Sequence, residues 1–284
     1  MGWRADDSET ALALATLTLE LGVPVRQAMT AEPGVVAAMN AALELCTGTV
    51  IALTDDDAEP RPDWLERLGR CFDDPAVGGA GGRDWQPTER GSREEVGRIQ
   101  WFGRVIGHHH LGVGPARPVD VLKGVNAAFR SPLLRTLRFD SRLQGAGAQM
   151  FWELALCLPL RRAGWTLVYD PAIAVEHHIE PRHDADQRHR GTFVPEPQVQ
   201  AVHNETLILL EHQRGFRRLA FIIWALLVGT RMEPGLAQIP RLWMMGDALA
   251  VARWRWTLVG RVRGWKSWCG SGGDPARSVP RPTV

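Results

Sequence analysis

VIALTDDD, residues 50–57, decides the fold of this chain, because an apolar run stops abruptly at three consecutive carboxylates. The run Val50–Leu53 predicts a buried strand. A proline-bearing turn follows, and the apolar spacing from Trp64 onward predicts that a helix begins there. Strand, turn and helix in this order are typical of an α/β sheet, in which ligands bind at the carboxyl ends of the strands.

The three acids of this stretch have two interpretations. Asp55, Asp56 and Asp57 would repel one another unless positive charge lay between them. Hard divalent cations take carboxylate oxygens and keep positions open for phosphates. The pattern therefore suits a metal site for a phosphorylated ligand, with Asp55 and Asp57 as the inner pair. The alternative is an acidic turn before the next helix, with Asp63 as its N-cap, and spacing alone leaves both open.

Size and composition exclude several classes of protein. A chain of 284 residues can form one large domain or two modest ones. Its net charge of +1 argues against a nucleic-acid-binding protein that relies on bulk electrostatics. The four cysteines are far apart, which fits neither a disulfide framework nor a zinc site and indicates a reducing compartment. Acids appear by Asp6, so no signal peptide is predicted, and we expect a cytoplasmic protein.

The order of apolar and polar segments divides the chain into an α/β domain, a linker, a helical region and a tail. Strands and helices alternate to about residue 180, which favours a mostly parallel sheet flanked by helices. We expect this α/β domain over residues 1–185 and a charged, proline-bearing linker over 186–201. A helical region is expected over 202–268 and a disordered, low-complexity tail over 269–284.

The helical region carries the longest apolar run, LAFIIWALLV at residues 219–228, between arginines. It is shorter than the roughly 20 residues needed to span a bilayer. A buried helix and a helix lying in a membrane interface both fit this run. Residues 247–265 mix arginine with tryptophan, as interfacial helices do, and favour peripheral contact at the cytoplasmic face of a membrane. The alternative is a helical pair that packs on the α/β domain.

Four residues outside the acidic stretch are candidates for chemistry. Glu153 begins a predicted helix after a glycine-rich loop, which suits a general base, although an ordinary first-turn acid is the alternative. His177 follows a predicted strand and could ligate a cation or be a satisfied core or surface histidine. Lys123 and Asn126 could bind phosphate or sugar hydroxyls, or belong to a simple turn.

Residues 85–118 form a long, polar, glycine-rich insertion that contains His108, His109 and His110. Adjacent histidines point in different directions in most backbones, so one ion rarely binds all three. We expect this cluster to contact an acceptor or solvent rather than a metal.

Four segments, taken in order, resemble the inverting family 2 glycosyltransferases of the GT-A fold. They read PGVVAAMNAALELCTGTVIALTDDDAEPRPDWLERL, LKGVNAAFR, FDSRLQGAGAQMFWELALCLPLRRAGW and LVYDPAIAVEHH. The resemblance implies a GT-A fold and transfer of a sugar from a nucleotide-sugar donor (a UDP-, GDP- or dTDP-sugar) to a hydroxyl acceptor. A cell-envelope or lipid-linked glycan is the acceptor we expect if the helical region touches a membrane.

The resemblance also implies a role for the acids. Residues 55–57 stand where the family has its DxD motif, which binds the ribose and diphosphate of the donor through Mg²⁺ or Mn²⁺. Glu153 falls on the second acid of the family's Glu-Asp pair, which is the catalytic base. Trp152 falls on the first acid, so this chain departs from the pattern there. We expect partial burial beside Trp152 and Phe151 to raise the pKa of Glu153.

Two further roles follow from the same resemblance. His177 matches the histidine of the family's P-x-A-x-V-x-H pattern, where several members ligate the metal together with the acids equivalent to Asp55 and Asp57. Asn126 matches the asparagine of the G-x-N-x-A-x-R segment near the diphosphate and the acceptor, and Lys123 directly precedes that segment.

The N-terminus departs from the family. Family members begin with a strand, a loop and a helix before the segment that here starts at Trp3. Either the true start lies upstream, or the donor pocket is incomplete and we expect weak activity. One alternative is a truncated, non-catalytic relative that binds a glycan or a partner. A second is a GT-A-like nucleotidyltransferase, but that class usually begins with a glycine-rich loop and a basic residue, which are missing here.

Overall fold

The computed structural model describes the chain except for residues 6, 22–24, 88–89, 179–192, 272–278 and 283–284. The strands are β1 (Gly2–Arg4), β2 (Ala28–Thr30), β3 (Val50–Leu53), β4 (Ala58–Pro60), β5 (Val77–Trp85), β6 (Arg98–Ile99), β7 (Val105–Ile106), β8 (Arg117–Pro118), β9 (Ala127–Arg130) and β10 (Thr166–His177). The α-helices are α1 (Ser8–Leu21), α2 (Val35–Leu45), α3 (Trp64–Cys71), α4 (Ser131–Leu137), α5 (Trp152–Arg162), α6 (Pro195–His212), α7 (Gly215–Leu227), α8 (Gln238–Met244) and α9 (Ala250–Gly270).

The central sheet has the order β3-β9-β5-β10-β4, with β8 also paired to β10. The fold class is α/β as expected, but the sheet is mixed rather than mostly parallel. Only β5 and β10 run parallel among the described strands of this sheet, and the other pairs are antiparallel. Parallel neighbours need a crossover connection, usually a helix. The described part of the chain between β5 and β9 has no α-helix, and β9 returns antiparallel.

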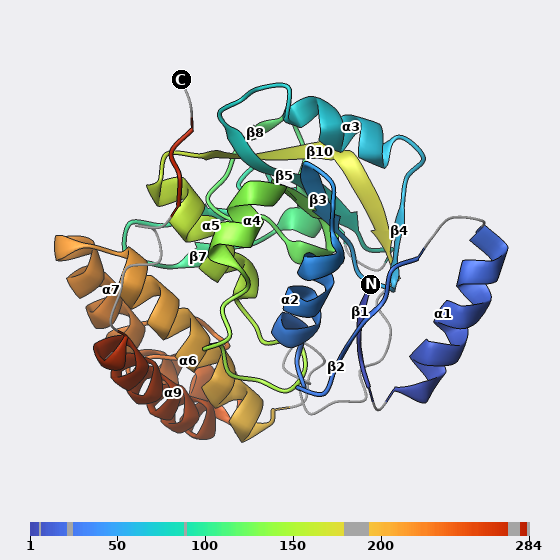
Figure 1. The fold of residues 1–284 in the computed structure, drawn as a ribbon. Helices are drawn as coiled ribbons and strands as arrows, with labels where there is room; N and C mark the ends of the chain where they lie inside the picture. Colours follow the sequence, from blue (N-terminus) through green and yellow to red (C-terminus); the bar gives the residue numbers. More distant parts are fainter. Residues whose placement is uncertain (6, 22–24, 88–89, 179–192, 272–278, 283–284) are drawn as a thin grey trace.

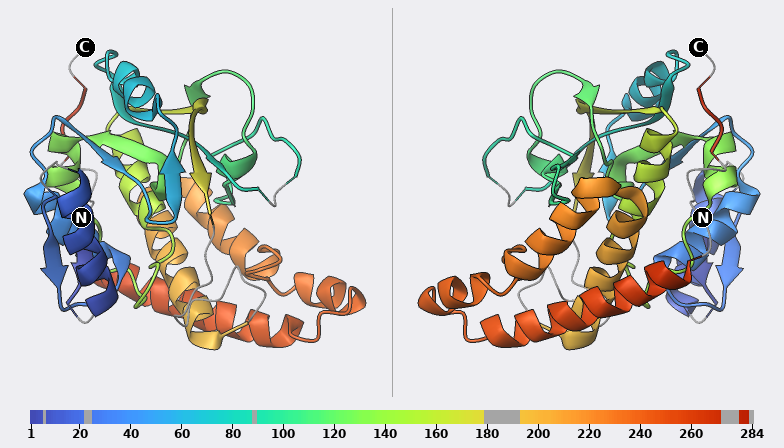
Figure 2. Two further views of the ribbon diagram at one scale, coloured as in Figure 1. Left: turned by 90° about the vertical axis from the view of Figure 1, so that its right-hand side faces the viewer. Right: turned by 90° about the vertical axis from the view of Figure 1, so that its left-hand side faces the viewer.

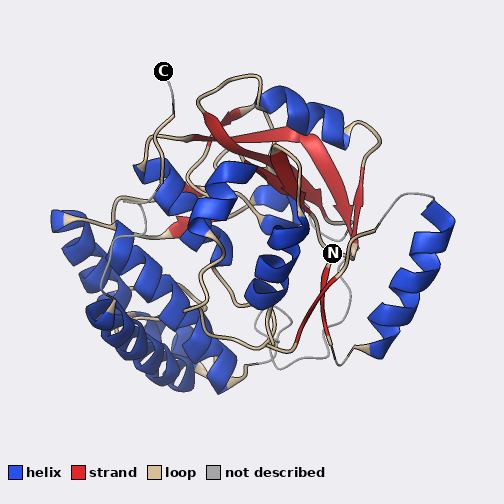
Figure 3. Ribbon diagram, viewed as in Figure 1, coloured by secondary structure: helices blue, strands red, loops and turns tan. Residues whose placement is uncertain are grey.

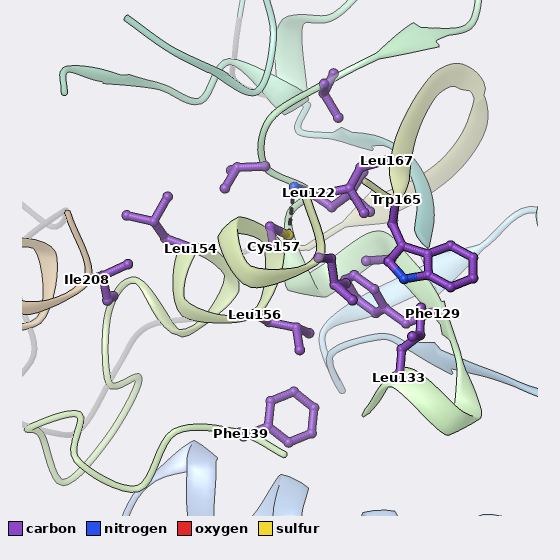
Figure 4. Packing of buried hydrophobic residues seen from close by; sticks show 14 of the residues in the cluster. Leu122, Phe129, Leu133, Phe139, Leu154, Leu156, Cys157, Trp165, Leu167 and Ile208 are labelled. Atoms are coloured by element: carbon purple, nitrogen blue, oxygen red, sulfur yellow. Dashed lines mark hydrogen bonds between the residues drawn. The ribbon is translucent and has the colours of Figure 1, made fainter. Parts of the chain in front are cut away.

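Helices cover both faces of this sheet (Figures 1 and 3). On one face, α2, α4 and α5 bury a large apolar core that Figure 4 shows around Phe129, Leu156 and Leu167. On the other face, Trp64 and Leu68 of α3 pack against a smaller cluster from the strands. β1 and β2 form a separate parallel pair beside α2. Burial on both faces explains why β3 and β9 are largely apolar.

Several expected elements differ from the structure in their bounds. The extended segment expected over residues 119–130 is divided by a 3₁₀ turn at Gly124–Asn126, and only β9 is a strand. The two strands expected at 166–169 and 173–175 are one strand, β10, with a register irregularity between Asp170 and Ala174. Much of the expected linker lies outside the described residues, and its C-terminal part is already helical because α6 begins at Pro195.

The end of the chain also differs from the expected disordered tail. α9 continues to Gly270, and after residues outside the described part the chain lies against the α/β domain. There Val279 is buried, and the Trp165 indole N–H donates to the Pro280 carbonyl at 2.7 Å. A buried indole N–H needs an acceptor, and the Pro280 carbonyl provides it, which explains why this part of the low-complexity tail lies against the α/β domain.

The C-terminal helices are joined to the α/β domain through α6, which is almost wholly buried. α9 crosses α6 very closely, because a Cβ at Gly260 would lie 2.6 Å from the Val202 Cβ, and one at Gly264 would lie 2.7 Å from the Thr206 Cβ. Among the described residues, none of the helices is both long enough and apolar enough to cross a bilayer.

A buried charged group fixes this crossing. The Arg261 guanidinium lies between the carboxylates of Glu205 (2.5 Å) and Glu233 (3.2 Å), and it also donates to the Thr206 hydroxyl. Burial and the neighbouring Glu233 charge raise the pKa of Glu205. A buried charge is tolerated only when it is paired, so the three side chains specify how α9 sits on α6.

α6 also holds the loop that precedes α5. The Asn204 side chain accepts from the Gln144 N–H at 2.8 Å and donates to the carbonyls of Gln144 and Met150. Next to it, the His203 ring contacts Asn204 Oδ1 through Nδ1 and Ser267 Oγ of α9 through Nε2. This continuous series of hydrogen bonds links α9 to the loop from which Glu153 emerges.

Candidate active site

The acidic stretch and His177 are brought together by strand pairing. The acids follow β3, and the chain then forms β4, which pairs antiparallel with the end of β10 so that Ala58 lies opposite His177. The His178 N–H donates to the Asp57 carbonyl at 2.8 Å and closes this arrangement. Two segments more than 100 residues apart therefore meet at one edge of the sheet.

Asp55, Asp57 and His177 form a cluster whose candidate ligand atoms lie within 4.8 Å of one another. His177 Nε2 is 3.3 Å from Asp57 Oδ1. Asp55 is exposed as a residue, but nearby chain partly removes water from its carboxylate; this and the neighbouring Asp57 charge raise its pKa. Asp56 is exposed and is not part of the cluster. The cluster matches the three metal ligands expected from the sequence, and a cation there would relieve the repulsion between the two carboxylates.

Asp84, at the end of β5, is a site residue that the sequence did not reveal. Its carboxylate is fully buried, forms an ion pair with Lys123 and lies 3.6 Å from His177 Nδ1. Burial alone would raise the pKa of Asp84, but the interaction with His177 and the positive charge of Lys123 lower that pKa well below its ordinary value. Asp84 therefore faces one nitrogen of the His177 ring while the other nitrogen faces Asp57, which is the place that outer partners of metal-binding histidines take. In the sequence, Asp84 stands near the end of an apolar, glycine-rich strand, just as Asp55 follows an apolar strand, and this position is the feature that could have identified it.

Lys123 and Asn126 occupy the 3₁₀ turn region between the strands, but their visible contacts are internal. Asn126 is fully buried, accepts from the Trp64 indole N–H at 2.8 Å and donates to the carbonyls of Arg83 and Ile173. These bonds use both amide hydrogens and the carbonyl oxygen, so Asn126 fixes the turn against α3, β5 and β10. Lys123 is one-third exposed and pairs with Asp84, which leaves it beside the cluster.

Glu153 lies in the first turn of α5, close to the same turn region. The Gly124 N–H donates to Glu153 Oε1 at 3.4 Å. Burial raises the pKa of Glu153, and the negative charge of Asp55 adds to this effect, while the Gly124 N–H and Lys123 oppose it. Gly124 thus joins Glu153 to the turn that follows Lys123, and Lys123 pairs with Asp84 beside the cluster.

Trp152, the residue at which the chain departs from the family pattern, has a packing role. Its ring lies so close to Gly124 that a Cβ on that glycine would be 2.0 Å from the ring, and it meets Phe139 edge to face. The indole therefore occupies the space between the 3₁₀ turn and the loop before α5. An apolar wall beside Glu153 favours its neutral form, in agreement with the raised pKa.

The three adjacent histidines are not a shared surface cluster. His109 is buried, its Nε2 lies 2.9 Å from the Val121 carbonyl, and its ring meets Tyr169 edge to face. Burial lowers the pKa of His109 to about 4, so the ring is neutral near pH 7. The expectation of contact with acceptor or solvent therefore does not hold for His109, and only His108 is exposed. The described metal-compatible cluster does not include any of the three.

Comparisons with known proteins agree with this geometry. The model of glycosyl transferase family 2 matches residues 6–140. A pre-mycofactocin glycosyltransferase of Mycobacterium tuberculosis is 29% identical over 147 residues, which cover 51% of this chain and 30% of that protein. An uncharacterized protein of Sinorhizobium fredii is 28% identical over 149 residues, or 49% of this chain and 16% of that protein. The matched region thus spans less than a third of either relative.

Solved structures of low sequence identity share the fold. TarS 1-349 of S. aureus, in complex with UDP-GlcNAc, aligns with a TM-score of 0.52 at 14% identity, covering 93% of this chain and 78% of that one. GalNAc-T7 with UDP, GalNAc and Mn²⁺ aligns with a TM-score of 0.56 at 12% identity, covering 88% of this chain and 50% of that one. The chain has the GT-A fold that these glycosyltransferases share, and its residues 6–140 match the model of glycosyl transferase family 2, in line with the resemblance of its sequence segments.

Proposed function

We propose that this chain is a metal-dependent, inverting glycosyltransferase that moves a sugar from a nucleoside-diphosphate sugar to a hydroxyl acceptor. The observation that supports it best is the meeting of Asp55, Asp57 and His177 within 4.8 Å. Asp84 and Lys123 connect this cluster to the turn at which the Gly124 N–H contacts Glu153. Ligands of open α/β sheets bind at this edge. TarS and GalNAc-T7, which share the fold, were solved with UDP-GlcNAc and with UDP, GalNAc and Mn²⁺ respectively.

The residues of the cluster fit a divalent cation. Carboxylates suit Mg²⁺ and Mn²⁺, and the imidazole of His177 favours Mn²⁺, because imidazole is a ligand of transition metals. Bound there, the cation would neutralise charge on the leaving nucleoside diphosphate. Asp84 orients His177, and Lys123 adds positive charge beside the cluster.

Glu153 has the position and the pKa direction of a general base. In the proposed reaction its carboxylate accepts the proton of the acceptor hydroxyl. The acceptor oxygen forms a bond to the anomeric carbon, while the bond from that carbon to the diphosphate oxygen breaks and its electron pair leaves with the nucleoside diphosphate. A single displacement inverts the anomeric configuration. The acceptor class that we propose is a cell-envelope or lipid-linked glycan.

A screen of nucleotide sugars tests the donor half of this proposal. We expect one UDP-, GDP- or dTDP-sugar to raise the melting temperature in Mn²⁺ and to lose that effect in EDTA, because a ligand that binds only the folded state stabilises it. Metal-dependent binding combined with release of nucleoside diphosphate would support the enzyme. Lack of stabilisation by every nucleotide sugar would favour the non-catalytic relative, a module that binds a glycan or a partner.

Asp84→Asn tests whether Asp84 positions His177 within the metal-compatible cluster. We expect the Mn²⁺ concentration for half-maximal activity to rise by about 10- to 100-fold, with most of kcat recovered at saturating Mn²⁺, because outer partners tune metal affinity. Asp120→Asn is the matched control, since Asp120 is similarly shielded but pairs with Arg161 outside the site. A loss of kcat that Mn²⁺ does not restore, or an equal effect in the control, would contradict the positioning role of Asp84.

A further inference from the structure

The C-terminal arm, residues 214–270, exposes an unusual amount of apolar surface. At its far end, in and just after α8, the side chains of Trp243 and Met244 are 75% and 82% exposed, and Met245 is 59% exposed. Figure 2 shows α7 and α9 converging on α8 at the opposite end of the molecule from α1. Large apolar side chains at such exposure mark a surface that another phase or molecule covers.

The apolar side chains of α7 form one stripe. Phe216, Leu219, Ile223 and Leu227 recur at helical spacing, and each is about half exposed or more. The opposite side of α7 carries Phe221, which is buried against Arg261 and the core. The helix therefore packs through one face and presents an apolar face outward.

α9 repeats this arrangement on its own outer side. Val251, Leu258, Val262 and Trp265 recur at intervals of seven, four and three residues, which places them on one face, and all are exposed. The opposite face carries the two glycines that meet α6. Arg255 and Lys266 are exposed next to the apolar stripe. Apolar faces bordered by arginine, lysine and tryptophan are typical of helices that lie in a membrane interface.

The charge of the arm distinguishes between two partners that could cover this surface, a second copy of the chain and an anionic bilayer. The arm carries ten arginine or lysine residues and two acids, Glu233 and Asp247, so its net charge is +8, whereas the whole chain has +1. A second copy of the chain would bring the same positive charge against the same face, and repulsion would oppose its docking. An anionic bilayer offers both apolar depth and negative headgroups.

We propose that the C-terminal arm docks on a bilayer rich in anionic lipid, with α8 and the outer faces of α7 and α9 in the interface. None of the described helices can span the membrane, so the arm lies on the bilayer. The apolar tip of α8 enters the interface, while the long arginine and lysine side chains reach the headgroups. This inference does not depend on the proposed catalytic function.

Vesicle flotation without nucleotide sugar or Mn²⁺ tests the docking directly. We expect the full chain to float with phosphatidylglycerol–phosphatidylcholine vesicles and to bind phosphatidylcholine vesicles much more weakly, with the difference reduced by salt. The Trp243→Ser/Met244→Ser double variant should lose at least about tenfold in partition coefficient. Leu12→Ser/Leu65→Ser, at sites 71% and 68% exposed outside the arm, is the matched control and should float like the wild type.

A charge-reduced variant tests the anionic preference. Arg255→Gln/Lys266→Gln should weaken binding to anionic vesicles by about fivefold per residue and leave binding to neutral vesicles unchanged. Equal flotation of wild type and the Trp243/Met244 variant would overturn the proposal. A stable dimer in solution that the same substitutions dissolve would also overturn it, and would assign the surface to a second copy. Because flotation needs no turnover, failure of the glycosyltransferase proposal would leave this result unaffected.

Discussion

Glu153→Gln is expected to lower kcat by about two to four orders of magnitude, which is the usual contribution of a general base. Glutamine keeps the shape of the side chain and its contact with the Gly124 N–H, but it cannot accept the acceptor's proton. Stabilisation by the nucleotide sugar in Mn²⁺ should stay unchanged, because the base contacts the acceptor rather than the diphosphate. Initial rates and thermal shifts measured side by side separate the two effects.

The pH profile adds a second test of Glu153. Its pKa is raised by burial, and a base works only when deprotonated, so kcat/KM should fall as pH drops through that raised pKa. This acidic limb should be lost from the residual activity of Glu153→Gln. Glu66 is an exposed acid in the first turn of α3, and Glu66→Gln is the matched control. This variant should keep both the wild-type kcat and the acidic limb of the pH profile. Loss of donor binding in Glu153→Gln would show that the side chain holds the donor instead.

Asp57→Ala is expected to abolish metal-dependent donor binding altogether. Asp57 contacts His177 and belongs to the cluster, so its removal takes away a ligand and the partner that faces the ring. Thermal stabilisation of about 2.7 kcal/mol, the amount for a ligand at 100 times its Kd, should vanish. Differential scanning fluorimetry measures this stabilisation, with the donor found in the screen and either Mn²⁺ or EDTA present.

Asp56→Ala provides the comparison for this prediction. Asp56 is exposed and lies outside the cluster, so most of the metal-dependent shift should survive its removal. Equal losses in Asp56→Ala and Asp57→Ala would mean that the acidic stretch acts through its total charge, not as a defined ligand set. If Asp57→Ala kept the full metal-dependent rise in melting temperature, the cluster would not be the metal site of the proposed reaction.

The sequence predicted those parts of the fold that depend on local pattern. The strand before Asp55, the helix from Trp64 and the helix that carries Glu153 lie where apolar spacing and turn residues placed them. Family resemblance then aligned His177 with the acids, and the β4–β10 pairing confirms that they meet. Local pattern and resemblance together were sufficient for the candidate ligands.

What the sequence did not predict depends on partners distant in the chain. Asp84 stands near the end of a strand, but its contacts with His177 and Lys123 depend on residues distant in the chain and could not be predicted from that position. Asn126 was expected near the diphosphate, but the Trp64 indole and two carbonyls surround its amide. The Pro280 carbonyl accepts from the indole of Trp165, 115 residues away in the chain. Such contacts are properties of packing and have no periodic signature.

The hydrogen bonds that run from Ser267 through His203 and Asn204 to Gln144 and Met150 have a consequence for protein engineering. The C-terminal helices are not a detachable anchor. A protein cut after α6, or a chimera with a C-terminal arm from another protein, would leave the His203 ring without its Ser267 partner. We expect this loss to loosen the loop before Glu153, so truncation should alter the proposed active site as well as any membrane contact.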